Sequence, residues 1–227
     1  MRAVNDDLMD TNMNCIMRNI RLPFLAGLLA VTIFLHATAQ AAAAPSAFVT
    51  ELTNNAFAAL RAKDISEAER FSRFRELLSE GVDLQRVGRF VLGPNWRRAN
   101  PEQQAEYQAL FSDYVIAAYA GRLKDYTESK YTISKTLQTG ENEYIVKTLF
   151  VHPKNPEPVH VDWRLREEGE ALKVIDLTIE GISMALTQRS EFSAIIQQNN
   201  GDIGALIDRL RNISSDIKAG KEVTVSK

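Results

Sequence analysis

The sequence predicts an α+β fold in which a curved antiparallel sheet of about four strands packs against helices from the N-terminal and C-terminal parts of the chain. Two observations predict it. Apolar residues recur every three to four positions from Ser46 to about Lys124, and again over Thr187–Gln198 and Asp202–Ile217. Between these helical stretches, from Tyr131 to Ile179, the apolar period changes to two. Strands grouped between helices are typical of a sheet that helices cover on one face.

The segment before the first helical pattern is predicted to be an export signal. Arg18 and Arg21 form its basic start, Leu22 to Leu35 is an apolar run broken only by one threonine, and Ala37 to Ala41 offers small residues for cleavage. The apolar run is shorter than the ~20 residues that a membrane-spanning helix needs, and a retained anchor is the alternative. We therefore expect residues 1–44 to be removed on export.

The exported chain is predicted to form one domain over residues 45–220, with a helical subdomain inside it, and a flexible tail over 221–227. The only cysteine, Cys15, precedes the apolar run, so no disulfide is expected, and a core of this size needs none. The formal net charge of −2 lacks the basic excess that is typical of nucleic-acid-binding proteins. A neutral or apolar ligand is therefore expected, and no nucleic acid.

Four helices are predicted before the strands. Apolar spacing indicates two amphipathic helices around Phe48–Leu60 and Ala68–Leu78, and a short helix over Leu84–Leu92. Asn100 to Gln103 then provides an N-cap, a proline at the first helical position and a glutamine at the third, so a long helix should begin there and extend to about Lys124.

The long helix carries an apolar face wider than a single packing stripe requires. Such a face is typical of a buried core, and the alternative is a wall that faces lipid. The residues of this face are Tyr107, Leu110, Phe111, Tyr114, Val115, Ala118 and Tyr119.

The strands show the alternation of a half-buried sheet. Apolar residues at odd positions of Val159–Leu165 alternate with charged residues at even positions, and Tyr144–Val151 and Leu172–Ile179 are comparable runs. Pro153–Pro158 and Glu167–Glu170 are predicted to be the turns between them. The pattern therefore predicts an antiparallel meander.

One motif invites an esterase hypothesis. Gly181 to Ala185 comes within one residue of the G-x-S-x-G nucleophile elbow, and it follows a strand and precedes a helix. An α/β-hydrolase needs its acidic residue and its histidine after the serine, but His36, His152 and His160 all precede Ser183. The order of residues therefore disfavours this chemistry.

Metal and cofactor chemistry lack the residues that they require. His152 and His160 flank a turn, but two imidazoles without a clear third ligand fall short of a zinc site. Glu167, Glu168 and Glu170 crowd one turn, where solvated charges are the simplest interpretation. The sequence contains no glycine-rich phosphate loop and no dinucleotide fingerprint. It predicts no metal, no cofactor and no enzyme.

Three segments carry a resemblance to a known family. These are the run from Val82 to Gly93 followed by Trp96, the helix start Pro101–Gln104, and the stretch Asp176–Phe192. They resemble the MlaC family, also called toluene-tolerance proteins, which bind phospholipid in the system that maintains outer-membrane lipid asymmetry. The resemblance spans about residues 46–220. The chain departs from many relatives in having Gln188 where they carry an aromatic residue.

The resemblance implies a fold and a function. The fold would be a sheet like that of nuclear transport factor 2, wrapped by helices from both ends of the chain. The function would be to carry a glycerophospholipid through the periplasm, between an outer-membrane lipoprotein complex and an inner-membrane ABC transporter complex. A subgroup of the family is associated with hopanoid biosynthesis, so a sterol-like triterpenoid is the alternative cargo.

A carrier of this kind needs an apolar slot, which we expect between the concave face of the sheet and the long helix. For each candidate residue, an ordinary position in the core is the alternative. Arg189 is expected near the mouth, as a salt-bridge partner or a headgroup contact. The candidates for the lining are Phe111, Val115, Val146, Val161, Trp163, Ile175, Leu177 and Ile179.

Two other classes of protein stay open. An exported enzyme on the same fold would need an acid–base group in the cavity, for which the candidates are Asp162, Asp176 or a histidine. An interaction module would have a filled core and no cavity.

Overall fold

The computed structural model describes residues 44–169 and 171–218, which all belong to one compact unit. The predicted tail and all but the last residue of the predicted export signal lie outside the described residues. None of the helices in the described part of the chain combines the length and apolarity that crossing a membrane requires.

The helices before the sheet begin at caps that the sequence contains. Ser66 accepts a hydrogen bond from the Glu69 amide at the start of the second helix. Asn100 and Gln103 form the predicted reciprocal capping box, and Pro101 is the first residue of the long helix. The elements are a first helix over residues 44–61, α2 (Glu67–Gly81), α3 (Leu84–Leu92), the short 3₁₀ helix η1 (Gly93–Arg97) and α4 (Pro101–Lys124).

The sheet is an antiparallel meander in the order β1-β2-β3-β4-β5. Four long strands agree with the prediction, and a two-residue fifth strand was not predicted. It pairs with β4 across a tight turn in which Glu180 and Gly181 have φ of 49° and 80°, a conformation that glycine favours. The strands are β1 (Lys130–Gly140), β2 (Glu143–His152), β3 (Asn155–Glu168), β4 (Ala171–Ile179) and β5 (Ile182–Ser183).

Both predicted turns are partly wrong, because β3 extends into each of them. The turn expected over Glu167–Glu170 begins later, since Glu167 and Glu168 still belong to β3 and pair with β4. The proline-rich segment 153–158 was expected to lie wholly between strands, but β3 begins at Asn155 and includes Pro156 and Pro158. Prolines fit there because β4 pairs with β3 only from Val161 onward, so their missing N–H groups remove no hydrogen bond on that side.

Two helices complete the fold, α5 (Met184–Gln198) and α6 (Ile203–Lys218). The prediction placed the start of α5 at Thr187, three residues too late. Ser183 is the N-cap, and its hydroxyl accepts from the Leu186 amide at 3.1 Å. Strand β5 therefore leads directly into α5.

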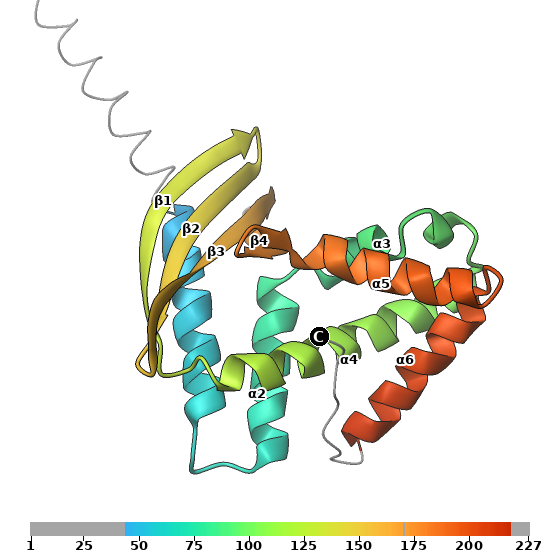
Figure 1. The fold of residues 1–227 in the computed structure, drawn as a ribbon, viewed down its shortest axis with the longest axis horizontal. Coiled ribbons are helices and arrows are strands. Elements are labelled where there is room, and N and C mark those ends of the chain that lie inside the picture. The colour runs from blue at the N-terminus through green and yellow to red at the C-terminus, as the bar shows by residue number, and fades with distance from the viewer. Residues whose placement is uncertain (1–43, 170, 219–227) are drawn as a thin grey trace, which may run out of the picture. The chain divides into compact units, whose positions relative to one another are not determined.

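The core has separate parts, and Figure 1 shows the helices and strands that form them. The first helix packs against the sheet, whereas α3, α4, α5 and α6 pack mainly on one another, with α3 and α5 also in contact with β4. The sheet and first helix share a buried cluster formed by Val49, Leu52, Tyr144, Val146, Leu165 and Val174. The helical cluster includes Tyr107, Phe111, Tyr114, Phe192, Ile196, Leu206 and Leu210.

Candidate functional site

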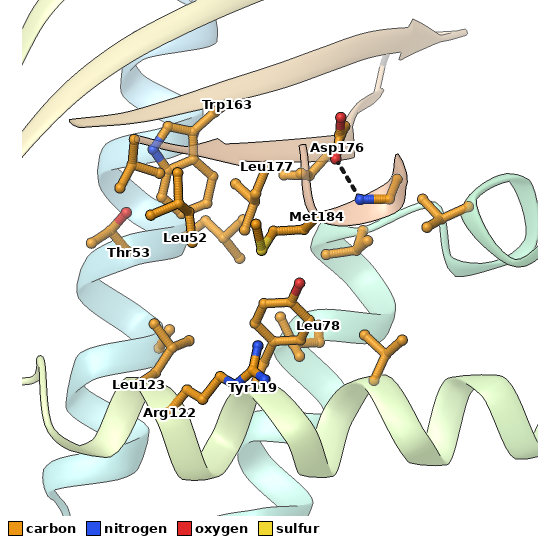
Figure 2. A pocket seen from close by; sticks show the side chains of 18 of the residues that line it. Leu52, Thr53, Leu78, Tyr119, Arg122, Leu123, Trp163, Asp176, Leu177 and Met184 are labelled. Atoms are coloured by element: carbon orange, nitrogen blue, oxygen red, sulfur yellow. Dashed lines mark hydrogen bonds between the residues drawn. The ribbon is translucent and has the colours of Figure 1, made fainter. Parts of the chain in front are cut away.

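A cavity of about 450 Å³ lies between strands β3 and β4, the first helix, α2, α3 and the second half of α4. Figure 2 shows Tyr119, Arg122 and Leu123 rising from α4 toward Trp163, Leu177 and Met184 on the opposite side. The volume falls within the range of ~300–1,000 Å³ that small-molecule sites usually have.

The wall of the cavity is apolar and is not packed shut. Val115, Val161 and Leu177 point inward but remain half-buried, whereas most inward side chains of a close-packed core would be fully buried. The indole N–H of Trp163 donates to the Thr148 hydroxyl at 3.0 Å, so its polar atom is already satisfied within the sheet. The wall therefore offers mainly carbon atoms to a ligand.

Seven of the eight candidate residues line this cavity. The exception is Val146, which is fully buried in the cluster between the sheet and the first helix, so the structure places it in the core. Contact with lipid stays a prediction for all eight. The seven lining residues are Phe111, Val115, Val161, Trp163, Ile175, Leu177 and Ile179.

A β-bulge in β4 changes which residues face the cavity. Arg164 lies opposite Asp176 and Leu165 lies opposite Val174, so Ile175 is an extra residue without a partner on β3. Val174 thus lines the cavity together with Leu177, although the two differ in parity along the strand. Strict alternation could not reveal this, so Val174 was not among the predicted wall residues.

The helices supply further wall residues that were not among the predicted ones. Their apolar spacing was visible in the sequence, but the spacing does not say which packed surface a helix face meets. The first helix contributes Leu52, Thr53, Ala56 and Phe57, while α2 and α3 contribute Leu78, Val87 and Val91, and α5 contributes Met184.

Asp176 lines the cavity but its carboxylate has a structural role. It accepts a hydrogen bond from the Ser183 hydroxyl at 2.5 Å and another from the Ala185 amide at 3.0 Å, the latter drawn in Figure 2. A carboxylate at the N-terminus of a helix is stabilised by the free amides and the helix dipole. Asp176 thus joins β4 to the start of α5.

The other acid–base candidates lie away from the cavity wall. Asp162 forms an ion pair with Lys147 at 2.7 Å, His160 is exposed, and the His152 ring packs against Tyr126. Within residues 44–169 and 171–218, no three His, Cys, Asp or Glu side chains gather as a metal site would require.

Five polar side chains of the wall come from α4, from the turn that follows it and from α5. They are Tyr119, Arg122, Asp125, Tyr126 and Gln188. Burial raises the pKa of the Tyr119 phenol to about 12, so at neutral pH it is an uncharged hydroxyl. Arg189, expected near the mouth, instead lies 5.1 Å from the centre of the Phe90 ring and is not part of the wall.

Thr53 allows a test of how a polar group in the cavity wall affects the stability of the protein. Its buried hydroxyl has no hydrogen-bond partner among the described residues, so Thr53→Val should raise the free energy of unfolding of the lipid-free protein by about 1 kcal/mol. Thr148 is the matched control, because its hydroxyl accepts from Trp163 and donates to the Val161 carbonyl. Thr148→Val should destabilise by about 1–2 kcal/mol. Urea denaturation measures both, and equal losses would contradict the assignment.

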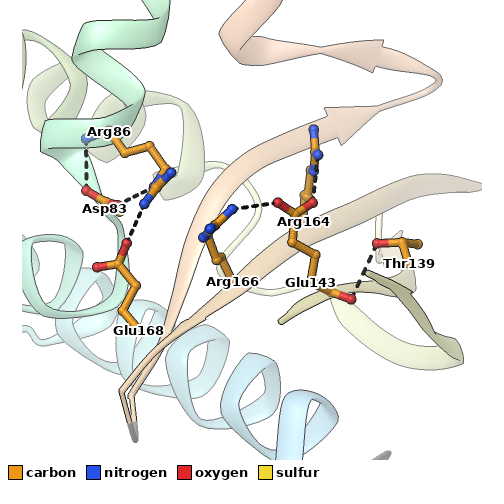
Figure 3. Close-up of polar contacts among 7 residues, drawn as sticks. All are labelled: Asp83, Arg86, Thr139, Glu143, Arg164, Arg166 and Glu168. Atoms are coloured by element: carbon orange, nitrogen blue, oxygen red, sulfur yellow. Dashed lines mark hydrogen bonds and ion pairs between the residues drawn. The ribbon is translucent and has the colours of Figure 1, made fainter. Parts of the chain in front are cut away.

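The opposite face of the sheet is charged, as Figure 3 shows. Glu143 accepts from Arg164 at 2.7 Å and from Arg166 at 2.9 Å. Arg86 of α3 binds Asp83 at 3.0 Å and Glu168 of β3 at 2.8 Å, and so ties this helix to the sheet. The charged even positions of β3 therefore face away from the cavity, as the alternation predicted.

The Glu143 ion pairs predict a dependence of stability on pH. The hydrogen bond from Arg164 lowers the pKa of the Glu143 carboxyl in the folded protein. A lowered folded-state pKa adds stability above the pKa of the unfolded chain, and this stability is lost as pH falls through the folded value. Glu143→Gln should therefore be less stable than the parent at neutral pH, with a difference that disappears in acid.

Denaturant titrations across the acidic range measure this difference. Glu157→Gln is the control, because Glu157 is exposed on β3 and takes no part in the ion pairs found among the described residues. A Glu143→Gln difference that stays constant with pH would refute the electrostatic explanation.

The sequence is similar to one protein family and to two characterised relatives. The family model described as MlaC protein matches residues 50–212. The intermembrane phospholipid transport system binding protein MlaC of Haemophilus influenzae is 24% identical over 137 residues, which cover 59% of this chain and 63% of that protein. The toluene tolerance protein ttg2D of Pseudomonas putida is 22% identical over 139 residues, covering 61% and 64%. The chain thus spans just under two thirds of the length of these relatives.

A solved structure shares the fold. It is that of a phospholipid-binding protein from Ralstonia solanacearum in complex with a phospholipid, and it superposes with a TM-score of 0.64 at 22% sequence identity. The match covers 76% of this chain and 97% of that one. It confirms the predicted α+β class and the helix-covered antiparallel sheet.

Proposed function

The chain belongs to the MlaC family, and we propose that it is a periplasmic carrier that holds the acyl chains of a phospholipid in its apolar cavity. The family assignment also bears out the expectation that the chain is not an enzyme. The proposal depends on the apolar cavity, whose wall is formed by side chains from the sheet and five helices and includes several that are only half-buried.

The physical need for such a cavity follows from the cargo. Two chains of ~16 carbons contain about 30 methylenes, and exposing them to water at ~0.8 kcal/mol each would cost on the order of 25 kcal/mol. A phospholipid therefore does not cross an aqueous compartment unaided at a useful rate. A protein that surrounds the tails with carbon, and leaves the head near water, makes the energy of the carried lipid similar to that in a bilayer.

The relatives support the cargo and the route. One is named as the binding protein of an intermembrane phospholipid transport system, and a protein with the same fold was solved with a phospholipid bound. We propose that this chain shuttles phospholipid between an outer-membrane lipoprotein complex and an inner-membrane ABC transporter complex. The predicted export signal agrees with a location in the periplasm.

The test is to express the full chain with its signal, purify the mature protein from the periplasm, and identify the extracted lipids by mass spectrometry. A signal-bearing protein of similar size without a cavity is the control. Stoichiometric phospholipid in the sample and not in the control supports the proposal. A bound hopanoid would instead show that the protein carries the alternative cargo. Protein that is lipid-free, and that takes no lipid from phospholipid vesicles, would refute the carrier function.

A further inference from the structure

We propose that Arg122 selects the cargo by its phosphate, so that the cavity takes phosphate-bearing lipids in preference to neutral lipids with the same tails. This inference rests on the proposed carrier function and names the side chain that would read the head of the lipid. It also favours phospholipid over an uncharged triterpenoid.

The first support is a gradient of exposure along one face of α4 and into the turn that follows it. Phe111, Val115, Tyr119, Arg122 and Tyr126 succeed one another at spacings of three or four residues, and all line the cavity. Phe111 is 1% exposed, Val115 and Tyr119 are half-buried, and Arg122 and Tyr126 are exposed. The face thus changes from apolar and buried to charged and solvent-accessible, as does a phospholipid from its tails to its head.

The second support is the position of the Arg122 guanidinium. Figure 2 shows it beside the Tyr119 ring at the cavity. Its positive charge opposes the rise that burial causes in the pKa of the Tyr119 phenol and of the Tyr114 phenol. Guanidinium groups form bidentate, charge-assisted hydrogen bonds with phosphate oxygens. The neutral Tyr119 hydroxyl is available to bond to the neighbouring ester oxygens.

The groups around Arg122 repel anions, so binding of a phosphate at the cavity should depend on Arg122. Asp125 also lines the cavity, and the C-terminal end of a helix carries partial negative charge, so both repel a phosphate. Asp176 is held by Ser183 and the amide at the start of α5. Arg122 is therefore the cation of the cavity wall in the described part of the chain, and its loss should leave a rim that disfavours anions.

The experiment compares two lipids that differ only in the head. Lipid-free parent protein is incubated with detergent micelles that hold equal amounts of dioleoylphosphatidylglycerol and dioleoylglycerol, then re-isolated, and the bound lipids are measured by mass spectrometry. The parent should prefer the phospholipid. Arg122→Gln should lower this preference about ten-fold, the factor that corresponds to losing one charge-assisted hydrogen-bonding contact. The total lipid bound per protein should stay unchanged, because the apolar wall is intact.

Arg97→Gln is the matched control, since Arg97 is exposed on η1 and does not line the cavity. It should keep the preference of the parent. An Arg122→Gln protein with the parent's preference would overturn the role of Arg122 while leaving the carrier function intact. Parent protein that takes up neither lipid would overturn the carrier function itself, and the role of Arg122 with it.

Discussion

Val161→Arg is expected to give a folded protein that purifies without lipid. Val161 lies on β3 with its side chain half-buried in the cavity wall. A guanidinium among acyl chains would be left without partners at a cost of several kcal/mol, and each ~1.4 kcal/mol lowers affinity about ten-fold. The lipid content per protein should therefore fall at least ~100-fold. Lipid extraction with mass spectrometry measures the content, and far-UV circular dichroism checks the fold.

The matched control is Val151→Arg on the neighbouring strand. Val151 is 37% exposed and is not part of the wall, so the same substitution there should leave the lipid content unchanged. If Val161→Arg does not fold, Ile179→Arg tests the same wall, because Ile179 pairs with Val161 on β4. Parent-like lipid content in a folded variant of either position would show that the cargo does not occupy this cavity.

Phe192→Ala is expected to have the largest effect on stability, a loss of about 3–5 kcal/mol in the free energy of unfolding. Phe192 is 3% exposed, and its ring centre lies 6.3 Å from those of Tyr107 and Phe111 and 5.7 Å from that of Tyr114. Removing the ring leaves a cavity in the helical cluster, which these aromatic neighbours cannot close without moving. Urea denaturation of the lipid-free protein measures the loss.

Leu186→Ala serves as the control on the same helix. Leu186 is 56% exposed, so its truncation should change stability by less than about 0.5 kcal/mol. A similar small value for Phe192→Ala would show that the aromatic cluster does not hold α4 and α5 together. Because Phe111 belongs both to this cluster and to the cavity wall, such a result would also weaken the view that the cluster supports the wall.

The sequence predicted those features that depend on neighbouring residues. The alternation along Val159–Leu165 placed the inward face of β3 correctly, because side chains in a strand point to opposite faces in turn. The start of α4 followed from Asn100, Pro101 and Gln103, whose capping contacts span only three residues. The fold class followed from the order of helices, strands and helices. The apolar repeat that identifies each of them also depends only on neighbouring residues.

Which inward residues belong to a cavity depends on tertiary packing and could not be predicted from the sequence. Val146 and Trp163 lie opposite each other on β2 and β3, yet Val146 is packed under the first helix and Trp163 lines the cavity. Arg122 lies at the cavity and Arg189 packs on Phe90, although both are arginines on helices that pack against the same core. Whether an apolar face is filled or left open depends on how closely segments far apart in the sequence approach one another. The spacing of apolar residues along the sequence gives no information about that distance.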